Sequence, residues 1–449
     1  MVAESLIAVI SSDLKFRERA NAIAELFKIK IKYYDSVDKF SNSRDEVKDA
    51  VFVLVSAVNA KEVSETAGLV QVAKVTSPQA NIAVVAHKKV DTAAAEIIKT
   101  SGASIVMLEN EYFENSKIEL VVSRKLYGEW IVVKTADLVK DRPINFTLYH
   151  LMPLNGRFLA ILQKGKILDE THLKSFDSVG ELYIKKEDLE NYKKYLIESN
   201  DVSAEGLKRR CRAVYLSFVD SYKNLAMLLT DQSEAASFDT GRELFQQLTQ
   251  MAEELIASLN RLREPWLVIN NSGVEDFTAI DRAPAISSYA GMFSMELEIG
   301  EPEEVMIAAL IADIGLLDLS PAGVLAVKEG NFAALNEVDA RIYKQHSLIS
   351  VNKALSRKVP IPENVKNIIL CSHERVDKKG FPNQIGLEKI PKESFLVHFS
   401  EILDQLTVLR FGKTRFTPEE ARQIVLQQEN TGGAFPPDML AQISKMMTS

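Results

Sequence analysis

The sequence predicts a multidomain protein: an α/β doubly wound domain, a small β-rich domain, a helical linker and a C-terminal all-α bundle. Three observations favour this order. Short apolar runs alternate with amphipathic stretches over residues 1–125, apolar side chains recur every three or four positions over residues 201–265, and helical segments punctuated by prolines fill residues 266–449. The length of 449 residues also suits about three domains, at roughly 150 residues each.

Five apolar runs predict the strands of the first domain. Each run is short, and a segment with helical spacing separates it from the next. Strands that alternate with helices form a parallel sheet with the helices packed on its faces, so a doubly wound domain is expected. The predicted strands are residues 6–10, 29–34, 51–56, 82–86 and 105–108.

Residues 126–200 change in character and predict the small β-rich domain. Two apolar runs flank the turn-forming segment Pro153-Leu154-Asn155-Gly156, which is typical of a hairpin. A short helix is expected to start near Asp169. The remaining predicted elements are strands at 145–152, 157–162 and 182–184 and a charged helix at 186–196.

The linker over residues 201–265 carries two apolar stripes with helical spacing, which predict a coiled coil or a helical bundle. A helix with such a stripe must bury it. We expect a homodimer built on these stripes; the alternative is that they pack within the same chain, above all the second one. The stripes are Leu207, Cys211, Val214, Phe218, Tyr222, Leu225 and Leu229, then Leu244, Leu248, Met251, Leu255, Leu259 and Leu262.

Charge and cysteine content narrow the function classes. Lys and Arg number 54 against 62 Asp and Glu, a net charge of −8, which argues against a nucleic-acid binder. Two cysteines make no disulfide framework, so a reducing compartment is expected. The first residues lack a basic region, and no apolar run reaches the roughly 20 residues of a membrane helix. The sequence therefore predicts a cytoplasmic protein without membrane insertion.

Residues able to perform chemistry gather in the last domain. Asp313 ends an apolar helical stretch, and a buried ionised carboxylate is costly unless it is paired or bound to a metal. His346 follows within a helical segment. His373 opens a loop that runs Glu374-Arg375-Val376-Asp377-Lys378-Lys379-Gly380-Phe381-Pro382, and Glu401 lies in a late apolar helix.

In their order and spacing these residues resemble the HD-GYP family, whose active members are metal-dependent phosphodiesterases that hydrolyse cyclic di-GMP. The run from His373 to Pro382, with Arg375, Asp377, Gly380 and Phe381, is the most specific part of the match. The resemblance implies an HD-domain-like bundle over residues 266–449. The segment from Tyr149 to Leu196 is similar to the small domain that often precedes HD-GYP modules.

Several family residues are replaced in this chain. Ala312 stands for the His of the His-Asp pair, Leu316 for the following Lys, and Ser372 for the first His of the His-His pair. Asp281 stands for the early His, and Phe277 for the acid one turn before it. Glu401 replaces the late Asp, and Phe381 the Tyr of the family motif.

These replacements decide the functional prediction. A hydrolase of this kind needs ligands for clustered metals and a cation for the phosphoryl oxygens. Asp313, His346 and His373 keep one facial set of ligands, with Asp281 and Glu401 as further members of a residual metal or polar site. No catalytic residue and no cofactor are expected, beyond one residual divalent metal. The alternative is that these residues bind no metal and form a hydrogen-bonded polar remnant of the family's site.

The leading hypothesis is a non-catalytic bacterial signalling protein, a pseudoenzyme that acts by binding a protein partner or cyclic di-GMP. One alternative is a weak, atypical metal-dependent cyclic di-GMP phosphodiesterase that uses Asp313, His346, His373 and Glu401. A second alternative is a pure scaffold without a nucleotide site.

The N-terminal domain resembles a response-regulator receiver domain. That family uses two acids after the first strand, a phosphorylated Asp after the third, Ser or Thr after the fourth and Lys after the fifth. Here those places hold Ser11-Ser12, Ser56, Ala86 and Glu109, and Asp13 fits a helix N-terminal residue better. Phosphoryl transfer needs the acceptor carboxylate and acids that hold Mg²⁺. The resemblance therefore implies a pseudo-receiver without a phosphoacceptor.

Overall fold

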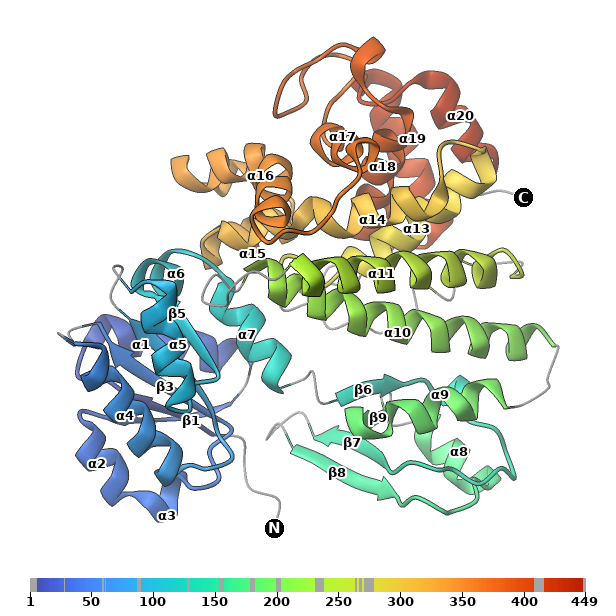
Figure 1. Cartoon of the computed structure of the whole chain (residues 1–449). Helices are drawn as coiled ribbons and strands as arrows, with labels where there is room; N and C mark the ends of the chain where they lie inside the picture. The colour runs from blue at the N-terminus through green and yellow to red at the C-terminus, as the bar shows by residue number, and fades with distance from the viewer. Residues whose placement is uncertain are drawn as a thin grey trace. The chain divides into compact units, whose positions relative to one another are not determined.

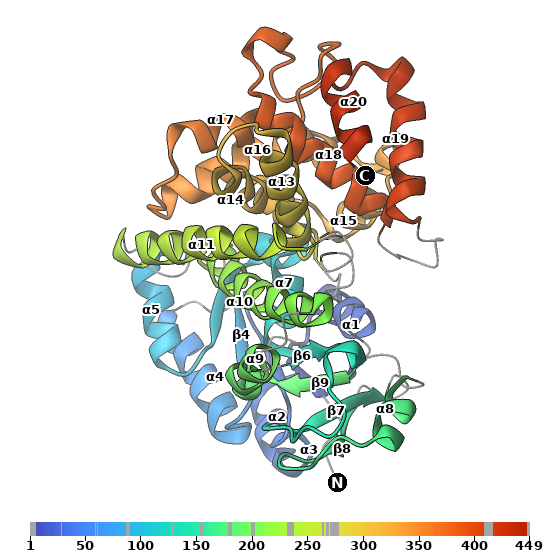
Figure 2. The ribbon, with the colours of Figure 1, turned by 90° about the vertical axis from the view of Figure 1, so that its right-hand side faces the viewer.

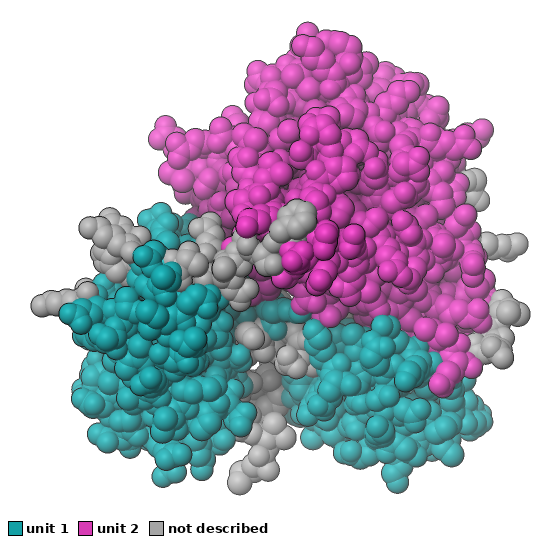
Figure 3. Space-filling model, viewed as in Figure 1, with its two compact units in different colours: residues 1–195, 231–235 teal, residues 196–230, 236–449 magenta. Residues whose placement is uncertain are grey.

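The computed structural model describes residues 6–27, 29–58, 60, 62–86, 90–126, 130–152, 157–177, 182–198, 203–230, 238–262, 265, 269, 278–407 and 416–446. The chain divides into two compact units, which Figure 3 shows in teal and magenta. The first holds residues 1–195 and 231–235, and the second holds residues 196–230 and 236–449.

The first unit begins with a parallel sheet of five strands in the order β2-β1-β3-β4-β5, which is the order of a doubly wound domain (Figure 1). All five predicted strands are confirmed, with ends that move by a residue or two. Strands β1, β3, β4 and β5 are buried along most of their length because helices cover both faces of the sheet, whereas the edge strand β2 is largely exposed. The strands are β1 (Leu6–Ile10), β2 (Lys30–Tyr34), β3 (Phe52–Ala57), β4 (Asn81–Ala86) and β5 (Ile105–Leu108).

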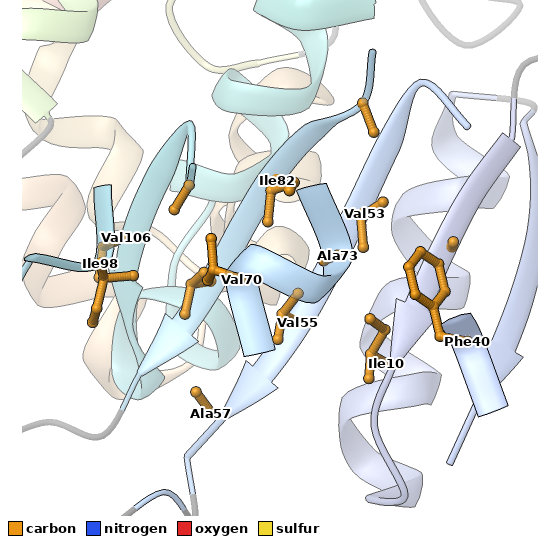
Figure 4. Packing of buried hydrophobic residues seen from close by; sticks show 14 of the residues in the cluster. Ile10, Phe40, Val53, Val55, Ala57, Val70, Ala73, Ile82, Ile98 and Val106 are labelled. Atoms are coloured by element: carbon orange, nitrogen blue, oxygen red, sulfur yellow. The ribbon is translucent and has the colours of Figure 1, made fainter. Parts of the chain in front are cut away.

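Side chains that alternate along these strands supply two cores. One face, drawn in Figure 4, packs Ile10, Val53, Val55 and Ile82 against Phe40, Val70 and Ile98 from the covering helices. The other face packs against α1 and α6, where the Phe16 and Tyr112 rings stack with centroids 4.4 Å apart. The helices are α1 (Leu14–Leu26), α2 (Val37–Asn42), α3 (Arg44–Val47), α4 (Val63–Thr76), α5 (Thr92–Thr100), α6 (Glu109–Glu114) and α7 (Lys117–Leu126).

A second sheet of four antiparallel strands follows, in the order β6-β9-β7-β8. The sequence analysis missed one of its strands, β6 (Trp130–Val133), which pairs with β9 (Leu182–Lys185). The predicted turn at 153–156 lies outside the described residues. The other elements are β7 (Leu148–Met152), β8 (Arg157–Leu162), α8 (Glu170–Asp177) and α9 (Leu189–Ile197), with 3-10 turns η1 (Thr135–Asp137) and η2 (Lys186–Asp188).

The second unit opens with two long helices, α10 (Ala204–Thr230) and α11 (Phe238–Leu259), which lie side by side in Figures 1 and 2. The apolar stripe of α10 is buried in the chain: Cys211, Phe218, Tyr222, Leu225 and Leu229 are at most 2% exposed. Leu248 and Leu255 of α11 are fully buried. Much of the stripe thus packs within the chain, as the alternative expected, whereas Leu207, Val214, Leu244, Met251 and Leu262 are only partly buried, and the homodimer stays a prediction.

The rest of the second unit is helical, as predicted. Prolines or capping residues start most of its helices; Ser320, Asn336 and Thr417 each accept a backbone N–H of the first turn. The elements are α13 (Ala283–Leu297), α14 (Pro302–Ala312), η3 (Asp313–Asp318), α15 (Pro321–Lys328), η4 (Phe332–Ala334), α16 (Glu337–Ser356), α17 (Glu363–Cys371), η5 (Leu387–Lys389), α18 (Lys392–Thr407), α19 (Pro418–Gly432) and α20 (Pro437–Met446).

Cys211 and Cys371 are both buried free thiols. Across the described part of the chain, every helix is too short or too polar to span a lipid bilayer.

Candidate metal centre

Asp313 is placed by a sharp change in backbone at the end of a buried helix. α14 ends at Ala312, and Asp313 begins the 3-10 turn η3. Gly315 lies so close to α16 that a Cβ there would come 2.2 Å from the His346 carbonyl oxygen. The Ser350 hydroxyl accepts the Gly315 N–H at 2.7 Å and donates to the Ala312 carbonyl at 2.7 Å. The glycine after Asp-Ile therefore brings the carboxylate against α16.

The two histidines arrive from α16 and from the end of α17. His346 is 1% exposed, and its Nδ1 donates to the Tyr343 carbonyl at 2.5 Å. This hydrogen bond leaves the lone pair of Nε2 directed away from the backbone of its own helix. His373 lies two residues beyond α17 and is 6% exposed.

Four side chains converge at one point. The His346 Nε2 lies 3.0 Å from the His373 Nε2 and 3.4 Å from the Asp313 Oδ1. The His373 Nε2 lies 3.6 Å from the Glu401 Oε2. One ligand atom from each of Asp313, His346 and His373 falls within 4.8 Å of the other two. Such a set of imidazole and carboxylate donors suits a first-row divalent metal.

The electrostatics of the cluster are compatible with a bound cation, or with a proton on Glu401. Burial and the adjacent Asp313 carboxylate raise the pKa of Glu401 well above its usual value. Burial, with His346 and His398 nearby, lowers the pKa of His373 well below its usual value. The Asp313 Oδ1 is buried without a hydrogen-bond partner. A divalent ion would compensate two converging carboxylates and use the lone pairs of both imidazoles, so these residues fit a metal.

The loop from His373 to Pro382 folds tightly over the cluster. The buried Glu374 carboxylate accepts the backbone N–H groups of Asn383, Gln384 and Ile385 at 2.6 to 3.2 Å. A Cβ on Gly380 would come 2.5 Å from the His373 carbonyl oxygen, so only glycine fits there. The Phe381 ring then stacks on His373 with centroids 4.7 Å apart, before the cis Phe381–Pro382 bond.

The remaining loop residues are structural. Arg375 and Asp377 form a bidentate pair at 2.9 and 3.0 Å, which lowers the pKa of Asp377 to about 2. The backbone N–H of Asp377 donates to the Gly433 carbonyl, which ties the loop to the end of α19. These contacts hold the loop in place, and none involves the four converging side chains.

The end of the cavity beside α13 has a different chemistry. Arg282 donates two hydrogen bonds to Asp404, at 2.5 and 3.1 Å, and both side chains are buried. Ala279 also lines the cavity and packs against the apolar cluster of Leu316, Leu319 and Val324. Asp281 does not join the group of Asp313, His346 and His373; its carboxylate accepts the Thr278 N–H at 2.6 Å. Phe277 lies outside the described residues.

The three positions at which the sequence analysis expects replaced family residues, Ala312, Leu316 and Ser372, are buried. Leu316 packs in an apolar cluster with Leu319 and Val324. Ser372 is 1% exposed, and its hydroxyl donates to the Ile369 carbonyl at 2.9 Å. Ala312 is buried at the end of α14.

Sequence reasoning missed several residues on this cavity, among them Arg282, Phe332 and the three that follow. His398 lies one turn before Glu401 on α18, with its ring centroid 5.4 Å from that of His373, and burial lowers its pKa to about 4. The spacing His398-x-x-Glu401 was a signal for a shared helix face. Lys328 and Tyr343 also line the cavity, whose volume is about 270 Å³, and nothing in their sequence context indicates this.

The carboxyl edge of the parallel sheet carries no such convergence. Ser11 follows β1 and accepts the Asp13 N–H, and Asp13 caps α1 by accepting the Phe16 N–H, as predicted. Ser12 is exposed, Ser56 lies near the end of β3, Ala86 ends β4 and Glu109 begins α6. These positions offer neither an acceptor Asp nor a pair of acids.

Comparison with known proteins identifies the helical region. Residues 244–433 match the HD domain family. This chain is 25% identical over 190 residues to a cyclic di-GMP phosphodiesterase of Vibrio cholerae serotype O1, a match that covers 40% of this chain and 37% of that protein. It thus spans well under half of that relative.

A solved structure similar to this chain is that of an HDG"Y"P protein from Bdellovibrio bacteriovorus. The two share 16% sequence identity with a TM-score of 0.49, over 72% of this chain and all of that chain. The family match begins at residue 244, within α11. Over residues 244–433, this chain is therefore similar to the HD domain family.

Proposed function

We propose that this chain is a non-catalytic signalling protein whose HD domain binds cyclic di-GMP around one divalent metal. Asp313, His346 and His373 would hold the metal, with Glu401 as a fourth ligand. A bound metal supplies a Lewis acid that attracts a phosphoryl oxygen. The similarity to a cyclic di-GMP phosphodiesterase supports the choice of ligand.

The observation that carries the absence of hydrolysis is the Arg282–Asp404 pair at the α13 end of the cavity. A two-metal site holds its ions about 3.5–4 Å apart, and each ion needs several protein ligands. The described residues supply three or four ligands in one place, whereas the neighbouring wall presents a guanidinium. The Asp404 carboxylate is already paired with Arg282, so it is not available as a ligand for a second metal.

The N-terminal domain supports a signalling role without phosphoryl transfer. Its sheet order is that of doubly wound domains, and the position after its third strand holds Ser56 in place of a carboxylate. We infer that it acts by contact with a partner protein.

One observation favours a second function, slow hydrolysis of the same ligand. The three-residue ligand group is complete for one metal, and Lys328 on the cavity wall provides a cation for a phosphoryl oxygen. Under this alternative, turnover would be weak because one metal replaces a cluster.

The test uses the full chain loaded with Mn²⁺. We expect about one tightly bound metal per chain, binding of cyclic di-GMP by calorimetry, and no linear dinucleotide or GMP by chromatography after prolonged incubation. His373→Ala should lose the metal, whereas His172→Ala should keep it, because the His172 side chain is 38% exposed and its contacts with Asp169 and Phe176 are local. Turnover that disappears in His373→Ala would establish the second function instead.

A further inference from the structure

The α15–η4 segment gives the cavity a wall unlike the metal ligands. Lys328, the last residue of α15, and Phe332, the first residue of η4, line the cavity together with Asp313, His346, His373 and Glu401. The segment thus faces the ligand group with a cation and an aromatic ring.

The position of Lys328 is tied to that of Leu316. Leu316 occupies the place where the HD-GYP resemblance implies a lysine, and it packs in an apolar cluster with Val324 and, less deeply, with Val327. Lys328 is the next residue along α15, and it lines the same cavity as Leu316. A positive charge missing from η3 is therefore present on the helix that packs against it.

Phe332 lies at the outer end of a row of aromatic rings. Its ring centroid is 4.9 Å from that of Tyr343, which in turn is 5.6 Å from His346 and 5.3 Å from Phe381. Phe332 is nevertheless 46% exposed. An aromatic side chain that lines a cavity and stays half exposed leaves a face available to a planar ligand.

The size of the cavity limits what it can enclose. Its volume of about 270 Å³ lies below the roughly 300–1,000 Å³ of pockets that enclose drug-sized ligands. A phosphoryl group beside a metal fits this space, and the rest of a nucleotide would extend past the mouth, where Phe332 is exposed.

We propose that Lys328 binds a phosphoryl oxygen and Phe332 stacks on a base, so that the α15–η4 segment is the nucleotide-recognition element of this site. The inference rests on the proposed function for the nature of the ligand. It assigns the phosphate contact to a lysine that the family motif does not contain, and it requires a ligand with both a phosphoryl group and an aromatic base.

The experiment measures binding of inorganic phosphate, GMP and cyclic di-GMP to the full chain by calorimetry, with and without Mn²⁺. We expect Lys328→Ala to weaken all three ligands about ten- to a hundredfold, the worth of a hydrogen bond to a charged group. Lys328→Arg should retain most of the affinity. Phe332→Ala should weaken the two nucleotides about tenfold, the worth of one base stack, and leave phosphate unchanged.

Matched controls separate these effects from general damage. Lys344 on α16 is exposed and lies off the cavity, and Leu387 in η5 is 45% exposed and distant in sequence. Lys344→Ala and Leu387→Ala should bind all three ligands as the wild type does. Circular dichroism of each variant checks its folding, and Lys328→Gln replaces Lys328→Ala if that variant misfolds.

The outcomes separate this inference from the proposed function. Wild-type affinity for phosphate in a folded Lys328→Ala, or for GMP in Phe332→Ala, overturns the inference while the metal and cyclic di-GMP results stand. A wild-type chain that binds no metal overturns the proposed function, yet a Lys328-dependent phosphate affinity without Mn²⁺ still supports the inference. Absence of binding by all three ligands in both states overturns it.

Discussion

The two ends of the HD-domain cavity solve the problem of buried charge in opposite ways. At the α13 end, Arg282 and Asp404 neutralise each other within the protein through two hydrogen bonds. At the other end, Asp313 and Glu401 approach each other without a basic partner of that kind, and burial with the Asp313 charge raises the pKa of Glu401. The first end is complete in itself, whereas the second needs a proton or a cation from solution.

This difference explains how a fold can keep part of a site. A charge pair inside the protein stabilises the bundle whether or not a ligand is present, but it also removes that wall from metal binding. The converging acids and imidazoles offer ligands to a metal, but they lower the stability of the metal-free protein. Three substitutions test the comparison.

The largest effect is expected at the self-paired end. Arg282→Met leaves the 1%-exposed Asp404 as a buried carboxylate without its cation, and breaking such a pair costs about 3–5 kcal/mol. Urea denaturation should show this loss. The double variant Arg282→Met/Asp404→Leu should recover much of it, and Lys353→Met, which breaks the more exposed pair with Asp318, should cost no more than about 1 kcal/mol. Equal losses in the two single variants would contradict the comparison.

The ligand end should respond with the opposite sign. Asp313→Asn removes one of two converging carboxylates, so the free energy of unfolding of the metal-free protein should hold or rise by about 1 kcal/mol, the scale of one pKa unit. Affinity for Mn²⁺ should fall by at least about a hundredfold, since even outer-sphere partners of a metal are worth 10–100-fold. Denaturation in the presence of chelator measures the stability, and metal titration measures the affinity. If metal-free Asp313→Asn is less stable than Arg282→Met, the proposed difference between the two ends of the cavity is wrong.

The smallest effect concerns pH. The folded-state pKa of Glu401 is raised, so its contribution to stability is complete below its unfolded value of roughly 4.5 and is lost as pH rises through the folded value. The depressed pKa values of His373 and His398 act in the reverse sense, since protonation of the unfolded chain destabilises the fold below about pH 6.5.

The difference in unfolding free energy between wild type and Glu401→Gln isolates the Glu401 contribution. With chelator present, this difference should fall steadily as pH rises from 4.5, and Mn²⁺ should flatten it because the bound ion holds the carboxylate ionised. Glu388→Gln, at an exposed position in η5, is the control. If this difference stays constant with pH in the metal-free protein, burial and the Asp313 carboxylate do not raise the pKa of Glu401.

Local pattern was enough for the elements and for most of the ligand group. Apolar runs bounded by polar segments predicted all five parallel strands. Four of them are covered on both faces and are therefore apolar along their length, whereas the edge strand β2 is largely exposed. Asp313, His346, His373 and Glu401 were predicted in one site and lie together. The strand β6 was missed because Trp130–Val133 becomes a strand only by pairing with β9, more than 50 residues later.

Chain order, spacing and residue type determined which helices and strands form and which side chains are chemically able to bind a metal. Only the tertiary structure decided which of them meet. Arg282 and Asp404 are 122 residues apart and became a buried pair, the stripe of α10 found its partner in α11, and Asp281 turned to a backbone N–H while Lys328 reached the cavity. The reason is physical: a buried charge or apolar stripe takes whichever partner the packing of distant segments brings within contact, and spacing along the chain does not encode that choice.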